Sequence, residues 1–158
     1  MPGFYELFLS SVARCPQNVA VEMRHAPGAG ESIERLTYTQ LQERVERVGA
    51  WLAKAGPIRG ERAAILAANG PLWVTSYLGV MSAGGVAVPL DTAFTAEQVA
   101  KLLRDSGSRY LFCDRRHLPT AEKAAAGIGA QLVLLEAIQG LGKASVRNLR
   151  QVLAALHV

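Results

Sequence analysis

The residues whose types and spacing could hold a phosphate group lie near the C-terminus, where residues 140–145 read GLGKAS. A phosphate-binding loop needs a Ser or Thr hydroxyl directly after its Gly-Lys pair, and an earlier glycine five residues before that pair. Ala144 occupies the hydroxyl position, and the earlier glycine is missing. The glycine pairs at 28–30 and 127–129 lack the third glycine of a dinucleotide-binding turn. We therefore expect exposed loops or turns at these places.

Residues that could act as nucleophiles, bases or metal ligands are scattered. Ser82 lies in VMSAG, one residue out of register with a nucleophile elbow. The histidines have no spacing that would let two of them share a metal, and we expect each to be a solvated surface residue: His25, His117 and His157. The acidic and basic residues at 43–47 fit a solvated helix face. Cys15 and Cys113 are expected to be buried apolar side chains in a reducing compartment.

Composition excludes several classes of protein. Half of the 158 residues are hydrophobic and 19% are charged, which is typical of one globular domain. The net charge of +4 comes from scattered basic residues, so we expect no nucleic-acid partner. No apolar run is long enough for a membrane span, and the N-terminus lacks the pattern of a secretion signal. A cytoplasmic location is the resulting expectation.

The first elements that would position any site are a helix, a hairpin and a second helix. Apolar spacing predicts a helix from Phe4 that ends near Cys15 and Pro16. Strands are expected at 19–24 and 33–38, joined by a Gly- and Pro-containing turn. The next helix is predicted to begin with a capping box between Thr39 and Gln42 and to close at Gly56 and Pro57.

Strands and helices alternate through the remainder of the chain. Strands are predicted at 63–67, 86–90, 110–113 and 131–135, and helices at 71–81, 95–106, 119–126 and 146–156. Thr95 and Gln98 are expected to form a capping box, and Gly107 to end that helix. Alternation of this kind predicts an α/β fold: one domain with a doubly wound, mostly parallel sheet, flanking helices and a small N-terminal β-hairpin.

Six short motifs follow one another along the chain. They are LTYTQL at 36–41, GERAAIL at 60–66, NGPLW at 69–73, VMSAGGVAVPLD at 80–91, FTAEQ at 94–98 and DSGSRY at 105–110. Their order and spacing resemble those of the adenylate-forming superfamily, which comprises acyl-CoA synthetases, aryl-CoA ligases, luciferases and peptide-synthetase adenylation domains. The resemblance runs from about Phe4 to Asp114. Each motif is weak alone, but their joint order is specific. The departures are small: Gln40 stands where Glu is usual, and Ser82 where Lys is usual.

The resemblance implies that residues 1–158 form the first subdomain of the N-terminal domain of an acyl-CoA synthetase, a partial adenylate-forming enzyme fold truncated before the phosphate-binding loop. In the family, that loop, the acidic residues for Mg and ribose, and a C-terminal lysine all come later. The fragment is therefore expected to carry no catalytic, cofactor-binding or metal-binding residue. ATP, Mg and CoA would act in the full-length parent, which needs charge stabilisation on the triphosphate.

Some of the motif residues have both a structural and a functional interpretation. Gly84, Gly85 and Pro89 are read as architectural, for a tight turn and a strand end. Asn69 could cap the following helix, and Trp73 could belong to the core. The functional alternative is that the residues near the strand ends wall the acyl or pantetheine channel of the complete enzyme: Asn69, Trp73 and Phe94.

The resulting hypothesis is an N-terminal fragment of an ATP-dependent fatty or aryl acid:CoA ligase. The parent would form an acyl-adenylate and pass the acyl group to CoA, whereas the fragment alone would be inactive. A stand-alone, non-catalytic interaction module derived from this fold is the alternative, and a flavodoxin-like domain holding its own nucleotide is a third. The expected partner is the remainder of the synthetase. Surface that the remainder would cover is expected to favour self-association of the fragment.

Overall fold

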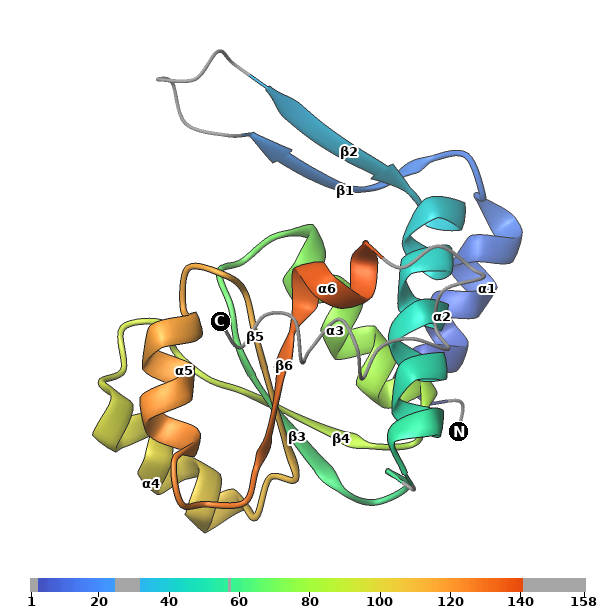
Figure 1. Ribbon diagram of the computed structural model, residues 1–158. Helices are drawn as coiled ribbons and strands as arrows, with labels where there is room; N and C mark the ends of the chain where they lie inside the picture. The colour runs from blue at the N-terminus through green and yellow to red at the C-terminus, as the bar shows by residue number, and fades with distance from the viewer. Residues whose placement is uncertain (1–2, 25–31, 57, 141–158) are drawn as a thin grey trace.

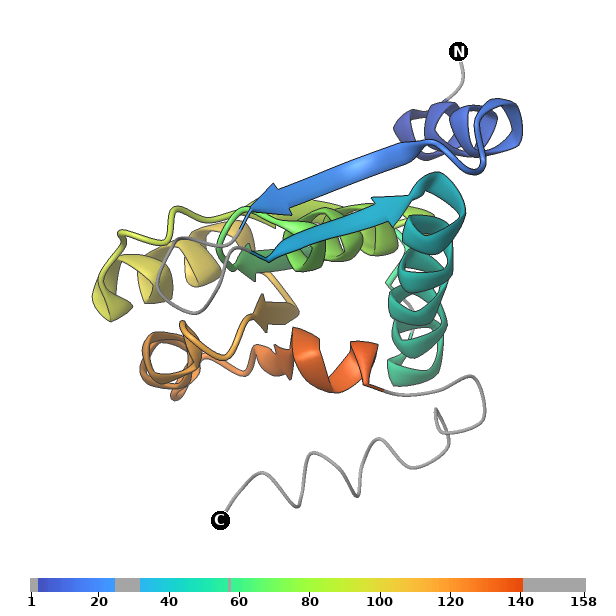
Figure 2. The same ribbon diagram turned by 90° about the horizontal axis from the view of Figure 1, so that it is seen from above.

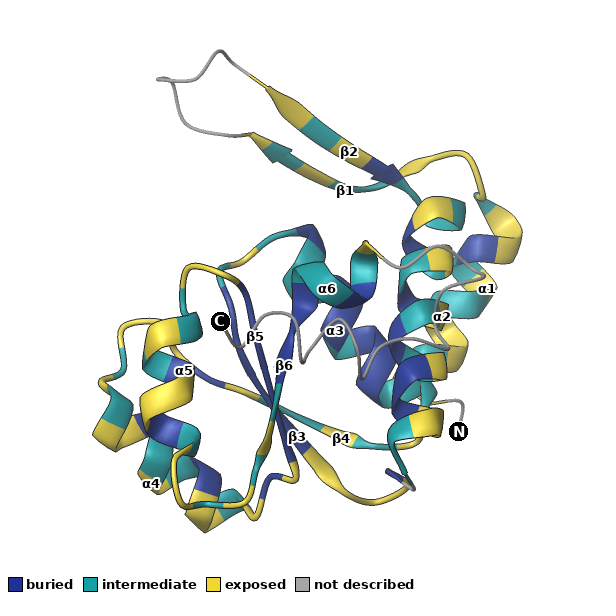
Figure 3. Ribbon diagram, viewed as in Figure 1, coloured by how far each residue is buried: buried dark blue, intermediate teal, exposed yellow. Residues whose placement is uncertain are grey.

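A four-stranded parallel sheet forms the centre of the molecule (Figure 1). The computed structural model describes residues 3–24, 32–56 and 58–140. The sheet has the strand order β4-β3-β5-β6 and consists of β3 (Arg62–Leu66), β4 (Val86–Pro89), β5 (Tyr110–Cys113) and β6 (Gln131–Leu134). Its two central strands, β3 and β5, are almost wholly buried (Figure 3), because helices cover both faces of the sheet.

The two faces of the sheet carry separate cores. Along β3, Ala63 and Ile65 contact one core, while Ala64 and Leu66 contact the other, as the alternation of a strand requires. The first core is covered by α2 (Tyr38–Ala55), α3 (Pro71–Ser82) and α6 (Leu135–Gln139). The second is covered by α4 (Ala96–Ser106) and α5 (Leu118–Ala125). The predicted doubly wound α/β fold is therefore confirmed.

The N-terminal elements lie beside this layered arrangement of helices and sheet. Helix α1 (Phe4–Arg14) is followed by the antiparallel hairpin of β1 (Val19–Arg24) and β2 (Ile33–Thr37), which forms a sheet of its own. Tyr5 and Phe8 of α1 pack against a small third core that includes Val45 of α2. Figure 2, which views the molecule from above, shows the hairpin lying over α3, which β1 contacts. The predicted hairpin is confirmed; the turn expected between its strands lies outside the described residues.

The start of α2 differs from the prediction. The motif contains Thr-x-x-Gln twice, and the capping box forms between Thr37 and Gln40 rather than between Thr39 and Gln42. The Thr37 hydroxyl accepts from the Gln40 amide at 3.2 Å, and the Gln40 side chain accepts from the Thr37 amide at 2.9 Å. Thr39 instead donates its hydroxyl to the carbonyl of Pro16 at 3.1 Å. The connection to the hairpin therefore sets the helix start two residues earlier.

Later elements follow the prediction more closely. Thr95 and Gln98 form the expected capping box of α4, which ends at Gly107 with a left-handed φ of 61°. The strand expected at 131–135 ends at Leu134, because Leu135 begins α6, a helix that was not predicted. The helix expected at 146–156 lies outside the described residues. Within the part of the chain that the structure describes, no helix is both long and apolar enough to cross a bilayer.

Candidate functional site

The carboxyl ends of β3 and β5 mark the point where the fold changes direction. These strands are neighbours, but β3 leads into α3 on the face of the first core, while β5 leads into α5 on the face of the second. The two connections diverge and leave a crevice between them. In open α/β sheets, ligands bind at such a switch point.

A cleft of about 220 Å³ occupies this position. Its walls come from the β3–α3 loop and the start of α3, the β5–α5 loop, α6 and the hairpin, which are far apart in the sequence. The lining residues are Met23, Glu34, Ala68, Asn69, Gly70, Pro71, Leu72, Asp114, Arg116 and Glu136. We take this switch-point cleft as the candidate functional site.

Asp114 is the polar centre of the cleft. It follows β5 directly, and only 8% of the residue is exposed. One carboxylate oxygen, Oδ2, accepts from the amide of Ala68 at 2.8 Å. The other, Oδ1, accepts from the amide of His117 at 2.9 Å and lies 2.6 Å from Nδ1 of that ring. Burial alone would raise the pKa of Asp114, but these hydrogen bonds and the nearby imidazole together hold it below the ordinary value.

A second carboxylate lies beside this network. Oε1 of Glu136 in α6 accepts from the amide of Arg115 at 2.9 Å. Its other oxygen, Oε2, is buried and has no hydrogen-bond partner within the described residues. Arg116, which is exposed, brings a positive charge to the same cleft. The site can therefore meet a ligand with both acceptors and a donor.

The hairpin contributes one wall of the cleft through Met23 and Glu34. A Cβ atom at Gly70 would lie 2.6 Å from Sδ of Met23, at the flexible end of that side chain, and the φ of 159° at Gly70 is itself unfavourable for other residues. Glu34 of β2 pairs with Arg44 of α2 at 3.0 Å, which fixes the hairpin to the body. The expectation that residues 43–47 are merely a solvated face is wrong for Arg44 and for Arg47, whose Nη1 donates to the carbonyl of Gln139 at 3.2 Å.

The three residues predicted as channel walls do not come together. Asn69 lines the switch-point cleft, but it does not cap α3, whose N-cap is Gly70. Trp73 is half-buried, packs against the first core and stacks on Tyr77 with ring centroids 5.2 Å apart. Phe94 packs against the second core, on the other face of the sheet. The cleft therefore contains Asn69 alone of the three.

His117 and Asp114 are functional candidates that sequence reasoning missed. His117 was expected to be solvated, but its side chain is only 12% exposed and is bound to Asp114. The available signal was an Asp directly after a buried strand with a His three residues later, so that the two side chains share one turn. The other two histidines lie outside the described residues. Cys113 is buried as expected, whereas Cys15 is only half-buried.

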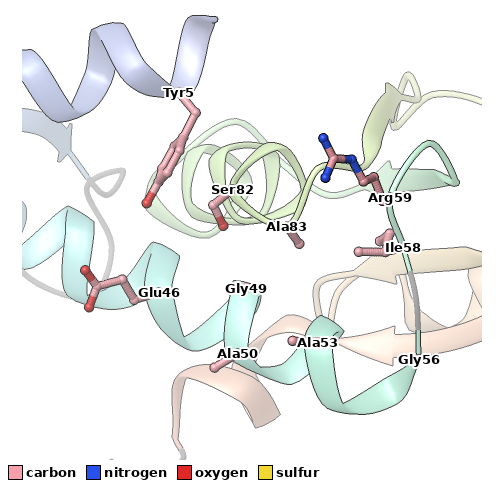
Figure 4. A pocket seen from close by; sticks show the side chains of 10 residues that line it. All are labelled: Tyr5, Glu46, Gly49, Ala50, Ala53, Gly56, Ile58, Arg59, Ser82 and Ala83. Carbon is pink, nitrogen blue, oxygen red and sulfur yellow. The ribbon is translucent and has the colours of Figure 1, made fainter.

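A larger cavity of about 540 Å³ lies at the opposite edge of the sheet, where β3 and β4 begin (Figure 4). Small residues of α2 form its floor, and it is lined by Tyr5, Glu46, Gly49, Ala50, Ala53, Gly56, Ile58, Arg59, Ser82 and Ala83. Ser82 donates its hydroxyl back to the carbonyl of Gly79 at 2.8 Å, inside its own helix. We assign the site to the smaller cleft, because buried polar groups from separate loops converge there.

Binding of metal-complexed phosphates would need a cluster of acidic, His or Cys side chains, and the structure describes residues 3–24, 32–56 and 58–140. Within these ranges, no three His, Cys, Asp or Glu side chains are grouped so that they could hold a metal ion. The glycines at 127 and 129 form a turn with positive φ values of 73° and 78°, as predicted. A phosphate-binding run near residue 140 would lie mostly outside the described residues.

Comparison with protein families gives one match over most of the chain: the family of AMP-binding enzymes matches residues 8–148. Among curated proteins, the chain is 36% identical to Chalcone synthase cfoA of Aspergillus candidus over 134 residues, 75% of this chain and 5% of that protein. It is 38% identical to a 4-hydroxybenzoate--CoA/benzoate--CoA ligase of Rhodopseudomonas palustris, over 59% of this chain and 17% of the ligase. The chain thus spans a small part of the curated relatives it matches.

Solved structures show the same fold. The chain resembles Klebsiella oxytoca NpsA in complex with 3-hydroxyanthranilyl-AMSN, with a TM-score of 0.75, 21% identity, and coverage of 92% of this chain and 27% of that one. It also resembles an N-terminal domain of FACL13 from Mycobacterium tuberculosis, with a TM-score of 0.73, 21% identity, and coverage of 92% and 38%. The described elements therefore match the N-terminal part of both proteins' fold.

Proposed function

Because this chain belongs to the family of AMP-binding enzymes, we propose that it is the first subdomain of an ATP-dependent acid–thiol ligase. In the proposed reaction, a substrate carboxylate oxygen attacks the α-phosphorus of ATP, and the bond to pyrophosphate breaks. A thiol sulfur then attacks the acyl carbon of the adenylate and loses its proton, while AMP leaves. The match over residues 8–148 is the observation that carries this proposal.

We propose that this chain supplies scaffold and one wall of the substrate site, and that the groups holding ATP and Mg belong to the remainder of the synthetase. The switch-point cleft supports this role, because ligands of parallel sheets bind at that edge. Exposed apolar side chains give the remainder a surface to cover: Phe4 is 58% exposed, Leu7 52% and Val86 48%. The same side chains would favour self-association of the isolated chain.

We propose a carboxylic acid as substrate and CoA as acceptor. One matched relative is named as a benzoate--CoA ligase, and another as a fatty acid--[acyl-carrier-protein] ligase of Streptomyces coeruleorubidus, which is 34% identical over 63% of this chain and 19% of that protein. Both names combine an acid with a thiol-bearing acceptor. The choice between an aryl and a fatty acid is left to experiment.

Pyrophosphate exchange into ATP tests the proposal directly. The complete protein is assayed with a panel of benzoates and fatty acids of increasing length, and residues 1–158 are assayed alongside. We expect acid-dependent exchange by the complete protein and none by residues 1–158. Absence of exchange with every acid would overturn the proposed function, and micromolar binding of ATP by residues 1–158 in calorimetry would overturn the proposed division of labour.

The channel-wall role of Asn69, Trp73 and Phe94 remains a proposal for the complete enzyme, although Trp73 and Phe94 lie outside the switch-point cleft. Trp73→Ala in the complete protein should change which acid chain lengths are accepted, because a large aromatic side chain is lost near the strand ends. Trp51→Ala is the control for lost core packing, since Trp51 belongs to the same core but is only 4% exposed, whereas Trp73 is half-buried. If both variants lose stability and keep the acid preference, Trp73 is a core residue and the channel role is wrong.

A further inference from the structure

The two loops of the switch-point cleft are joined through one side chain. The carboxylate of Asp114, which follows β5, accepts from the amide of Ala68, which follows β3, and the two residues are 46 positions apart. Ala68 is the residue directly before Asn69 and Gly70. The position of that loop is therefore fixed by Asp114, a side chain from the loop that follows β5.

His117 completes the arrangement from the other side. Both its amide and its ring contact Oδ1 of Asp114, so Oδ2 is left for Ala68. Nδ1 lies 2.6 Å from the carboxylate and must carry a proton to donate there, which fixes the tautomer and the ring plane. The carboxylate cannot rotate away from Ala68 without losing the two contacts to His117.

The loop is also held from above. Gly70 lies against Met23 of the hairpin so closely that a Cβ atom would collide with it. The hydrogen bond from Asp114 is therefore the directional contact on the segment that presents Asn69 to the cleft, and Met23 adds packing beside it. Binding sites require this kind of support, because a group displaced by about 1 Å can lose a large part of its effect.

We propose that Asp114, oriented by His117, is a positioning residue that holds the 68–70 loop so that Asn69 forms the substrate-side wall of the cleft. This inference rests on the proposed function, and it identifies the acid-binding step as the step that Asp114 supports. Asp114 does not itself need to touch the substrate. Its carboxylate is already occupied by Ala68 and His117.

Asp91 provides a matched comparison at the same edge of the sheet. It follows the neighbouring strand β4 and its Oδ1 also accepts from a backbone amide, that of Ala93, at 2.9 Å. This bond stays within its own loop, and Asp91 is exposed. Replacing Asp91 therefore removes a similar hydrogen bond without uncoupling two loops.

The experiment measures the loop and the substrate step in the same variants of the complete protein. Asp114→Ala should accelerate hydrogen exchange of the Ala68 amide by about tenfold or more, because a buried donor loses its partner. The KM for the acid in pyrophosphate exchange should rise by about tenfold, with the KM for ATP nearly unchanged. His117→Asn, which keeps a side-chain donor near Asp114, should retain most of the wild-type KM, whereas His117→Ala should not. Asp91→Ala should change neither the hydrogen exchange of the Ala68 amide nor the KM for the acid.

The outcomes distinguish a failure of the positioning inference from a failure of the proposed function. If Ala68 exchange accelerates while the KM for every acid stays unchanged, the bond is structural only and the positioning inference is wrong. If Ala68 exchange is unchanged in Asp114→Ala, the inference is also wrong. If the wild-type protein activates no acid at all, the proposed function fails first, and the inference fails with it even where Ala68 exchange accelerates.

Discussion

Two cavities lie at opposite ends of the parallel strands, one at the amino edge and one at the carboxyl edge of the sheet, and they differ in the residues that line them. At the amino edge, the larger cavity of about 540 Å³ exists because small residues of α2 and α3 leave space beside a close helix contact. At the carboxyl edge, the cleft of about 220 Å³ is smaller, but Asp114, His117 and Glu136 gather polar groups there from separate elements. Volume alone favours the amino edge, whereas the converging polar groups favour the carboxyl edge. Converging buried polar groups are the better guide to a binding site.

The largest expected effect tests whether the carboxyl-edge cleft is sealed beneath its polar groups. Cys113 ends β5 under the cleft, and burial, followed by the charge of Asp114, raises its pKa to about 12. At pH 8 only about one in ten thousand such thiols is ionised, so Cys113 should resist alkylation. The half-buried Cys15 should be labelled in the folded protein.

Mass spectrometry after iodoacetamide treatment distinguishes the two thiols. Cys113 should become reactive only in denaturant. Rapid labelling of Cys113 in the native protein would show that the carboxyl edge opens and that the cleft is not sealed beneath its polar groups.

The next effect concerns the helix contact beside the larger cavity. A Cβ atom at Gly79 of α3 would lie 2.5 Å from Cβ of Val48 in α2. Gly79→Ala should therefore lower the free energy of unfolding by about 2 kcal/mol through overpacking, although alanine usually favours a helix. Urea denaturation measures the change.

Gly49 offers the control for this substitution. Its Cβ would lie 2.6 Å from the hydroxyl of Ser82, which can be removed, and at ordinary contact distance, 3.8 Å, from the carbonyl oxygen of Gly79. Gly49→Ala combined with Ser82→Ala should cost less than about 1 kcal/mol. If Gly79→Ala is as stable as the wild type, close packing does not explain the amino-edge cavity.

A smaller effect tests the charge of Asp114 through pH. Its folded-state pKa lies below the ordinary value of 3.8, so the ionised carboxylate stabilises the fold above that value. This contribution should be lost as the pH falls through the depressed folded-state pKa. Asp114→Asn should lower the free energy of unfolding by about 1–2 kcal/mol near neutral pH.

The difference between the wild type and Asp114→Asn should shrink as the pH falls below 3.8, because the wild-type carboxylate is then progressively protonated and becomes neutral like the Asn amide. Chemical denaturation at several pH values gives both curves. A difference that stays constant down to the most acidic pH would show that the charge of Asp114 contributes nothing.

The smallest effect is expected from filling the larger cavity. Ala53 lines it and is exposed. Ala53→Leu should change the free energy of unfolding by less than about 0.5 kcal/mol and leave the KM for the acid unchanged. A rise in that KM comparable with Asp114→Ala would move the substrate site to the amino edge and reverse the comparison.

Sequence reasoning predicted the elements well, because periodicity and capping are local. The alternation from Ala63 onward predicted a parallel sheet, and the capping pair at Thr95 was found where expected. At the first capping box, however, Thr37 and Thr39 have the same local pattern. The choice between them depends on the contact with Pro16, across the hairpin, which no local pattern contains.

The candidate site was harder to predict, because it too depends on contacts between segments that are far apart in the sequence. Asp114 and Ala68 meet only because β3 and β5 are neighbours, and strand order cannot be read from alternation. Asn69 was predicted correctly to lie at the strand ends and lines the cleft. Phe94 was grouped with it because both were expected near strand ends, but Phe94 packs against the second core, on the other face of the sheet.

The long sequence separation of the Ala68–Asp114 bond also bears on how the chain reaches its native state. A contact between residues 46 positions apart can form only after the intervening chain has folded back and the two central strands have paired. It should thus be absent from the folding transition state. Replacing Asp114 would then shorten the lifetime of the native state while leaving the rate of refolding almost unchanged.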